Sequence, residues 1–260
     1  MASFANDAGL SDDKFYLWMA IASALVAVGG FSFTYLGPLV TGAFSGPAVL
    51  HLHGLLSFAW MVLFIAQASF ISTRRNQLHR TTGIFGVALA TAMVFTVVNA
   101  GIDGLHNGIN AGYAIESREF LYVTMSQISL FSLMVIGAVA YHRQPEFHKR
   151  FMILATIALL PPATARVLFY LFAAPEMGSR PGLWLARPPA NSVDFTVIAA
   201  MLANLLMIPA FVHDWRTRGK PHVVYVVAGG FMILVNVLRG PASRSDLWHA
   251  AAGTLAAWSS

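Results

Sequence analysis

Residues 48–71 form an apolar stretch without a single Asp, Glu, Lys or Arg. At about 1.5 Å of rise per residue, a helix of this length reaches across the roughly 30 Å hydrocarbon core of a bilayer. Comparable stretches recur along the whole chain and predict seven membrane-spanning helices, at residues 15–36, 48–71, 82–101, 119–141, 150–173, 192–213 and 222–239.

The composition supports this interpretation. The 260 residues are 57% hydrophobic and only 10% charged, whereas a soluble domain carries about 25% charged residues. The strands of a membrane barrel would show alternating segments of about ten residues, but the apolar runs here are continuous. We therefore predict an all-α polytopic membrane helix bundle that forms one transmembrane domain over residues 1–260.

The loops between the predicted spans indicate an orientation. One set of loops, at 72–81, 142–150 and 214–221, carries most of the basic residues: Arg74, Arg75, Arg80, Arg143, Lys149, Arg150, Arg216, Arg218 and Lys220. By the positive-inside rule these loops and the N-terminus lie in the cytoplasm, which predicts a bacterial inner-membrane protein. The net charge of +5 is thereby explained by topology. The expected surroundings are the lipid bilayer and other membrane subunits, and not nucleic acid.

Several kinds of chemistry are excluded or unsupported. The chain contains no cysteine, which rules out disulfides and thiolate metal sites. It has neither a GxSxG elbow nor a phosphate-binding GxxxxGK[ST] loop. The N-terminal segment lacks the features of a secretory signal, so the first span is expected to be retained. Residues 243–258 are too short to span and predict an interfacial helix that places Trp248 and Trp258 at headgroup depth.

The three basic loops resemble one another. Each is followed by a histidine at the start of a predicted span, namely His79, His148 and His222, so the hairpins form a degenerate threefold repeat. Three imidazoles at one level predict a metal site of the zinc type, and two of them predict the axial ligands of haem b. The alternative is that these histidines contact lipid headgroups or cap turns.

A second group of polar residues is predicted in the outer half of the bundle. Intramembrane ionisable groups are costly and point to function, and here they converge on one level from several helices: His53, Arg166, Gln127, Asn236 and Arg239. His51 and His53 are about 200° apart on a helix, so they cannot share one pocket unless the helix begins between them. Arg166 either meets an anionic group, a ligand or a carboxylate such as Asp103, or snorkels to the interface.

Prolines inside two spans predict helix breaks. Pro161 and Pro162, and likewise Pro209, lack the backbone N–H that continues a helix. The first pair lies one turn before Arg166, so a kink there frees carbonyl groups at the level of the outer polar residues.

The order of motifs is HxHG at His51–Gly54, LHR at Leu78–Arg80 and FHKR at Phe147–Arg150, followed by Asp214 and a basic turn that leads to His222. This order resembles a group of uncharacterised bacterial multi-pass membrane proteins of the domain-of-unknown-function type, over about residues 48–250. The resemblance implies the architecture but no reaction. There is also a distant likeness to transmembrane b-type cytochromes, from which the chain departs because His142 lies at the end of its span.

Three functions therefore stay open. The first is a membrane protein with a histidine-based haem or metal site, acting in redox chemistry. The second is a non-catalytic binder or transporter of a small molecule in the outer-half pocket around His53 and Arg166. The third is an accessory subunit of a larger membrane complex.

Overall fold

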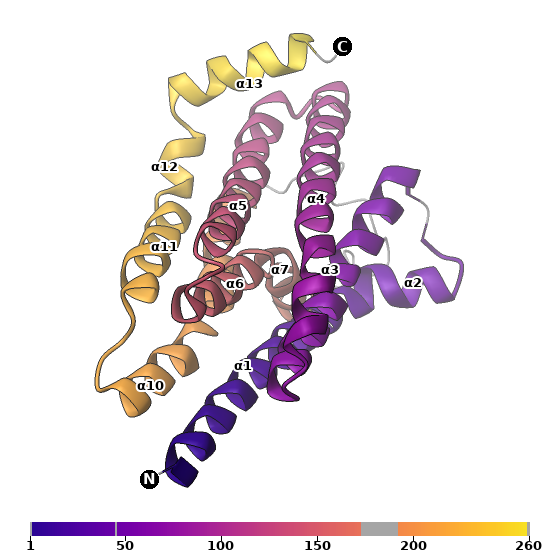
Figure 1. The fold of residues 1–260 in the computed structure, drawn as a ribbon. Coiled ribbons are helices and arrows are strands. Elements are labelled where there is room, and N and C mark those ends of the chain that lie inside the picture. Colours follow the sequence, from indigo (N-terminus) through magenta and orange to yellow (C-terminus); the bar gives the residue numbers. More distant parts are fainter. Residues whose placement is uncertain (1, 45, 173–191, 259–260) are drawn as a thin grey trace.

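The computed structural model describes residues 2–44, 46–172 and 192–258, and throughout these ranges the ordered elements are helices, without a strand (Figure 1). Their bounds are α1 Ala2–Phe31, η1 Ser32–Leu36, α2 Gly37–Val40, α3 Ala48–Ser72, α4 Asn76–Asn110, α5 Ala114–Ala140, α6 Pro145–Ala158, α7 Pro161–Phe172, α9 Ser192–Asn204, α10 Met207–Arg218, η3 Tyr225–Gly229, α11 Gly230–Val237, α12 Arg239–Ser243 and α13 Asp246–Trp258.

Six helical segments of the described chain are long and apolar enough to cross a membrane, which confirms the all-α bundle. The stretch predicted as a seventh span, 222–239, is a shorter apolar helix, Tyr225–Val237, that begins with the π-helical turn η3. The predicted span 82–101 lies within the much longer helix α4, because the polar residues at both of its ends continue the helix instead of ending it.

The predicted proline breaks are present. Helix α6 ends at Ala158 and α7 begins at Pro161. Because Pro162 has no N–H, the carbonyl of Ala158 cannot receive its helical hydrogen bond and accepts one from the Gln127 side chain instead. Helix α9 ends at Asn204, and α10 begins at Met207, two residues before Pro209. The carbonyl of Leu205, to which Pro209 cannot donate, accepts from the N–H of Ile208 at 3.0 Å.

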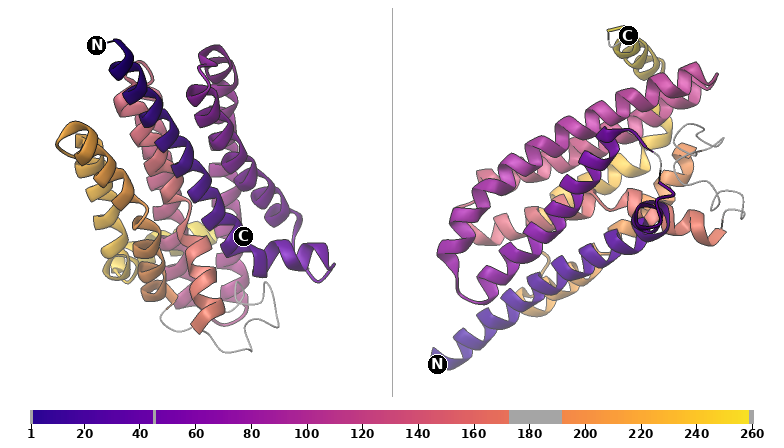
Figure 2. Two further views of the ribbon diagram at one scale, coloured as in Figure 1. Left: turned by 90° about the horizontal axis from the view of Figure 1, so that it is seen from below. Right: turned by 90° about the vertical axis from the view of Figure 1, so that its right-hand side faces the viewer.

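The basic turns meet at one end of the bundle, which we call the basic end. Helices α3 and α4 form an antiparallel hairpin, as do α5 and α6, and the N-terminus of α1 lies at the same end as their turns (Figures 1 and 2). Side-chain contacts connect α6 to two other helices at this end: Lys149 Nζ lies 4.7 Å from the centre of the Tyr16 ring of α1, and Glu146 pairs with Arg218 of α10. The three predicted hairpin ends therefore share one level.

Helix α6 lies at the centre of the bundle. Its residues 153–158 are all buried, so every face of this second half of the helix is enclosed by neighbours, as its apolar sequence requires. Trp60 of α3 reaches it by donating a hydrogen bond from Nε1 to Thr156 Oγ1 at 3.2 Å.

The C-terminal helix α13 crosses the ends of α4 and α5 at the side of the molecule opposite the basic end (Figure 1). Trp248 anchors it there, since its Nε1 donates to the carbonyl of Arg118 at 2.7 Å. Ala252 packs with Leu105 and Leu121 in a small core of their own. The predicted short final helix is thus present, held by protein contacts.

The contact between α1 and α7 depends on a glycine. A Cβ atom at Gly30 would lie 2.3 Å from the carbonyl oxygen of Ala163, whereas one at Gly29 would meet no heavy atom within 4 Å. We expect Gly30→Ala to lower the free energy of unfolding by about 1–3 kcal/mol, because the two backbones must separate. Gly29→Ala is the matched control and should be neutral or slightly stabilising. Thermal unfolding in detergent measures both, and equal melting temperatures for the two variants would contradict this packing.

Candidate functional site

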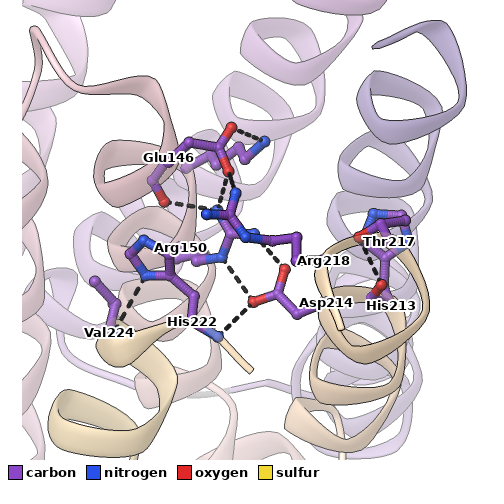
Figure 3. Close-up of polar contacts among 9 residues, drawn as sticks. Glu146, Arg150, His213, Asp214, Thr217, Arg218, His222 and Val224 are labelled. Carbon is purple, nitrogen blue, oxygen red and sulfur yellow. Dashed lines mark hydrogen bonds and ion pairs between the residues drawn. The ribbon is translucent and has the colours of Figure 1, made fainter. Parts of the chain in front are cut away.

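A buried ion pair joins α6 to α10 at the basic end (Figure 3). Arg150 donates from Nε to Asp214 Oδ2 at 2.9 Å and from Nη2 to Asp214 Oδ1, with the two side chains 1% and 0% exposed. Glu146, one turn earlier on α6, accepts from Arg150 Nη1 at 2.8 Å. This bidentate geometry is the strongest arrangement available to an arginine and a carboxylate.

The turn after α10 folds back onto the same carboxylate. Gly219 has a φ of 75°, a left-handed conformation that glycine adopts without strain and that ends α10. The backbone N–H of His222 then donates to Asp214 Oδ2 at 3.0 Å (Figure 3). The His222 ring packs against Phe147, with ring centres 4.6 Å apart, and its Nδ1 accepts from the N–H of Val224 at 3.2 Å.

The charged side chains of this network have partners within the protein. Asp214 accepts from Arg150 and from the His222 backbone, and the Arg150 guanidinium also lies 5.8 Å from the Tyr225 ring centre. A network with its charges already matched is suited to holding helices together, and it offers little to a ligand.

The outer half of the bundle holds a different arrangement, the Arg239 cluster, which consists of Arg239, Gln127, Asn236 and Thr196. Arg239 begins α12 and is 0% exposed. It donates from Nη2 to Gln127 Oε1 and, at 2.6 Å, to Asn236 Oδ1. Its Nη1 lies 3.2 Å from both the carbonyl and the hydroxyl oxygen of Thr196. The cluster thus ties α12 to α5, α9 and α11.

The oxygen atoms that accept hydrogen bonds from Arg239 are all neutral. Among the described residues, no carboxylate forms an ion pair with its guanidinium. Two buried donors also lack a hydrogen-bond partner there, Arg239 Nε and Asn236 Nδ2. Asn236, like Arg239, is 0% exposed. The cluster therefore has a buried positive charge without a direct ion-pair partner among the described residues, and two unused N–H donors.

The carboxylates of Asp194 and Glu119 pair with Arg244 and not with Arg239. Asp194, in the first turn of α9, accepts from Arg244 Nη2 at 2.7 Å, and Glu119 Oε2 lies 3.6 Å from Arg244 Nε. A Cβ atom at Gly240 would lie 3.1 Å from Asp194 Oδ1, which places this carboxylate directly over the backbone of α12. Arg244 thus bridges α5 and α9 on the exposed side of the cluster.

Of the five residues predicted to bind a ligand, the structure joins three. Gln127, Asn236 and Arg239 belong to one network, whereas His53 and Arg166 lie on α3 and α7 and no hydrogen bond given by the described residues links them to it. Arg166 donates to the carbonyl of Pro162 at 2.8 Å and lies 4.2 Å from the Phe31 ring centre.

The two outer histidines point to different surroundings, as their spacing predicted. The hydroxyl of Tyr35 lies 3.3 Å from His51 Nδ1. The Nδ1 of His53 is buried and has no hydrogen-bond partner among the described residues.

The three histidines predicted to bind a metal do not form one group. His79 and His148 are neighbours, with ring centres 6.1 Å apart, but His222 is held against Phe147 by the turn after α10. Within the described residues, no set of three or more His, Asp or Glu side chains is arranged to hold a metal ion. The three-histidine site predicted from sequence is therefore not formed, because the third imidazole is used in packing.

Other residues of these networks were not predicted. Thr196 resembles any threonine in an apolar helix, which normally bonds its own backbone. The Asp214–Arg150 pair joins residues of two different basic loops. The sequence indicated it only in that one acidic and one basic residue were predicted at the same membrane level.

Comparisons with known proteins identify no relative: no protein-family model, curated protein or solved structure matches the chain. The resemblance to uncharacterised bacterial membrane proteins and to b-type cytochromes stays a prediction.

We expect the loss of one partner of the Arg150–Asp214 ion pair to lower the stability of the protein strongly. In Asp214→Ala, Arg150 loses its main counter-charge and the His222 backbone loses its acceptor, so the free energy of unfolding should fall by about 3–5 kcal/mol. Arg218→Ala removes a guanidinium that is 40% exposed from Glu146 and should cost at most about 1 kcal/mol. Chemical unfolding in mixed micelles compares the variants, and similar losses for both would show that the buried pair is not special.

We expect His222 to make the stability of the protein depend on pH. It lies outside the long apolar helices, where burial, and then the positive charge of Arg150, lower the pKa of its imidazole below that of an exposed histidine. The unfolded state therefore binds a proton more readily, and stability should fall as the pH drops below about 6.5. His222→Asn does not titrate and should show a shallower fall between pH 7 and 5. Identical pH profiles for the variant and the wild type would refute this role.

Proposed function

We propose that the protein is an integral membrane protein that binds a small anion at the Arg239 cluster. The carrying observation is that a completely buried guanidinium is surrounded by neutral oxygens and has no carboxylate partner among the described residues. Arginine keeps its charge at any accessible pH. Burying an ion costs several kcal/mol unless a counter-charge offsets it.

The unused donors support this choice. Arg239 Nε and Asn236 Nδ2 both carry hydrogen and both lack an acceptor. An anion that accepts from these two groups would satisfy them and supply the missing negative charge at once. Because neither side chain has any exposed surface, the ligand is a small monovalent anion such as chloride or formate.

The distribution of basic residues supports a topology for this function. Each of the turns at 73–75, 141–144 and 219–221 contains at least one Arg or Lys, and all three lie at the basic end. With this end in the cytoplasm of a bacterium, the Arg239 cluster lies in the outer half of the inner membrane.

Asn236→Asp is the sharpest test. Its Oδ1 already lies 2.6 Å from Arg239 Nη2, so the substitution supplies the counter-charge from within the protein. In wild type, chloride or formate should raise the melting temperature relative to sulfate at equal ionic strength. A ligand at about 100 times its Kd contributes about 2.7 kcal/mol. Asn236→Asp should be more stable than wild type in sulfate and no longer respond to chloride or formate.

Two further variants control this experiment. Asn204→Asp places a carboxylate at another buried asparagine, one that accepts no hydrogen bond from an arginine among the described residues, and should be destabilising. Arg239→Lys keeps the charge but loses Nε and the planar fork, and should weaken the anion effect at least tenfold. A rise in melting temperature that is equal in wild type, Asn236→Asp and Arg239→Lys would refute an anion site and reveal a general salt effect.

A further inference from the structure

Two imidazoles from different hairpins face each other at the basic end. His79 lies in the first turn of α4 and His148 in the first turn of α6. Their ring centres are 6.1 Å apart and their planes are almost perpendicular, at 86°. Both side chains are partly buried. Residues 69 positions apart in the sequence are thus brought into ring contact by the two helix hairpins.

The hydrogen bonds of His148 determine which of its nitrogens is available. Its Nδ1 lies 2.8 Å from the carbonyl oxygen of Ala138, at the end of α5. A carbonyl oxygen only accepts, so Nδ1 carries the hydrogen and Nε2 presents a lone pair. A backbone carbonyl on the other ring nitrogen is the usual support of a metal-binding histidine.

One nitrogen of the His79 ring lacks a hydrogen-bond partner among the described residues. The Nδ1 of His79 is buried and has no hydrogen-bond partner within the described part of the chain, while the backbone of Gln67 also interacts with this imidazole. A buried imidazole nitrogen without a partner costs free energy unless something binds it.

Gln67 of α3 offers a third donor atom beside this pair. The Thr82 hydroxyl donates to the carbonyl of Leu78 at 2.6 Å, so its oxygen must accept from Gln67 Nε2, also at 2.6 Å. This fixes the amide orientation and leaves Gln67 Oε1 buried without a partner among the described residues. That oxygen lies 3.8 Å from the Cβ position of Gly83, one turn after His79 on α4.

We propose that His79 and His148 bind a single copper ion, with Gln67 Oε1 as an additional oxygen ligand. Since a metal–imidazole bond is about 2.0–2.1 Å long, two rings that share one ion have centres from about 4.5 Å apart at a ligand angle of 90° to about 6.3 Å apart at 180°, so the observed 6.1 Å fits a wide angle. Imidazole is a ligand that copper favours, and copper(II) binds N/O sites more tightly than the other divalent first-row ions. This site is independent of the Arg239 cluster.

Copper titration of the purified full-length protein in detergent tests the proposal. Low-temperature electron paramagnetic resonance should show one copper(II) per chain, with hyperfine splitting from two nitrogen ligands. His79→Ala and His148→Ala should each weaken binding by about 10- to 100-fold or more and reduce the nitrogen count. Gln67→Leu should leave two nitrogens and weaken binding less.

His142→Ala is the matched control. This histidine is exposed at the end of α5, and its Nδ1 contacts the carbonyl of its own helix at Val139, so its loss should leave copper binding unchanged. Loss of the signal in His142→Ala, or a one-nitrogen spectrum in wild type, would reveal surface binding only and overturn the proposal. A haem absorption band that disappears in His148→Ala would assign the pair to haem and overturn it as well. Melting temperatures verify that each variant is folded.

Discussion

The interior of this bundle is governed by the need of every dehydrated polar group to find a partner among the helices themselves. The break between α6 and α7 shows the consequence. Pro162 cannot donate to the carbonyl of Ala158, and that carbonyl takes its hydrogen bond from Gln127 of α5. The other end of the same amide accepts from Arg239. One missing backbone hydrogen bond in the central helix thus positions the side chain on which the Arg239 cluster is built.

The two buried arginines Arg150 and Arg239 differ in whether a carboxylate balances their charge. Arg150 has Asp214 and Glu146 as partners, and the result is a closed network that clamps α6, α10 and the following turn together. Arg239 has only amide, hydroxyl and carbonyl oxygens around it. Because the cost of dehydrating both cations is comparable, the difference in counter-charge separates a structural arginine from one suited to hold an anion.

The candidate sites were predictable in part. Gln127, Asn236 and Arg239 share one level in the predicted spans, and they do form one network. His53 and Arg166 interact electrostatically with each other, but no hydrogen bond among the described residues links them to that network. Depth along a helix does not determine the direction in which a side chain points around it. His79 and His148 meet as their positions suggested. His222 does not join them. The left-handed turn at Gly219 and the hydrogen bond from the His222 backbone N–H to Asp214 place its ring against Phe147.

The sequence alone determined the helical class, the approximate positions of the long helices, the proline breaks and the gathering of the basic turns at one end. These follow from local rules: the length of an apolar run, the missing N–H of proline and the placement of charge. The tertiary structure decided which polar groups are partners, and therefore which charge is matched and which is not. Hydrogen bonds between helices depend on how each helix is rotated and how the helices cross. The pairs Arg150–Asp214 and Arg239–Gln127 join residues more than 60 positions apart, and no local sequence pattern encodes such pairings.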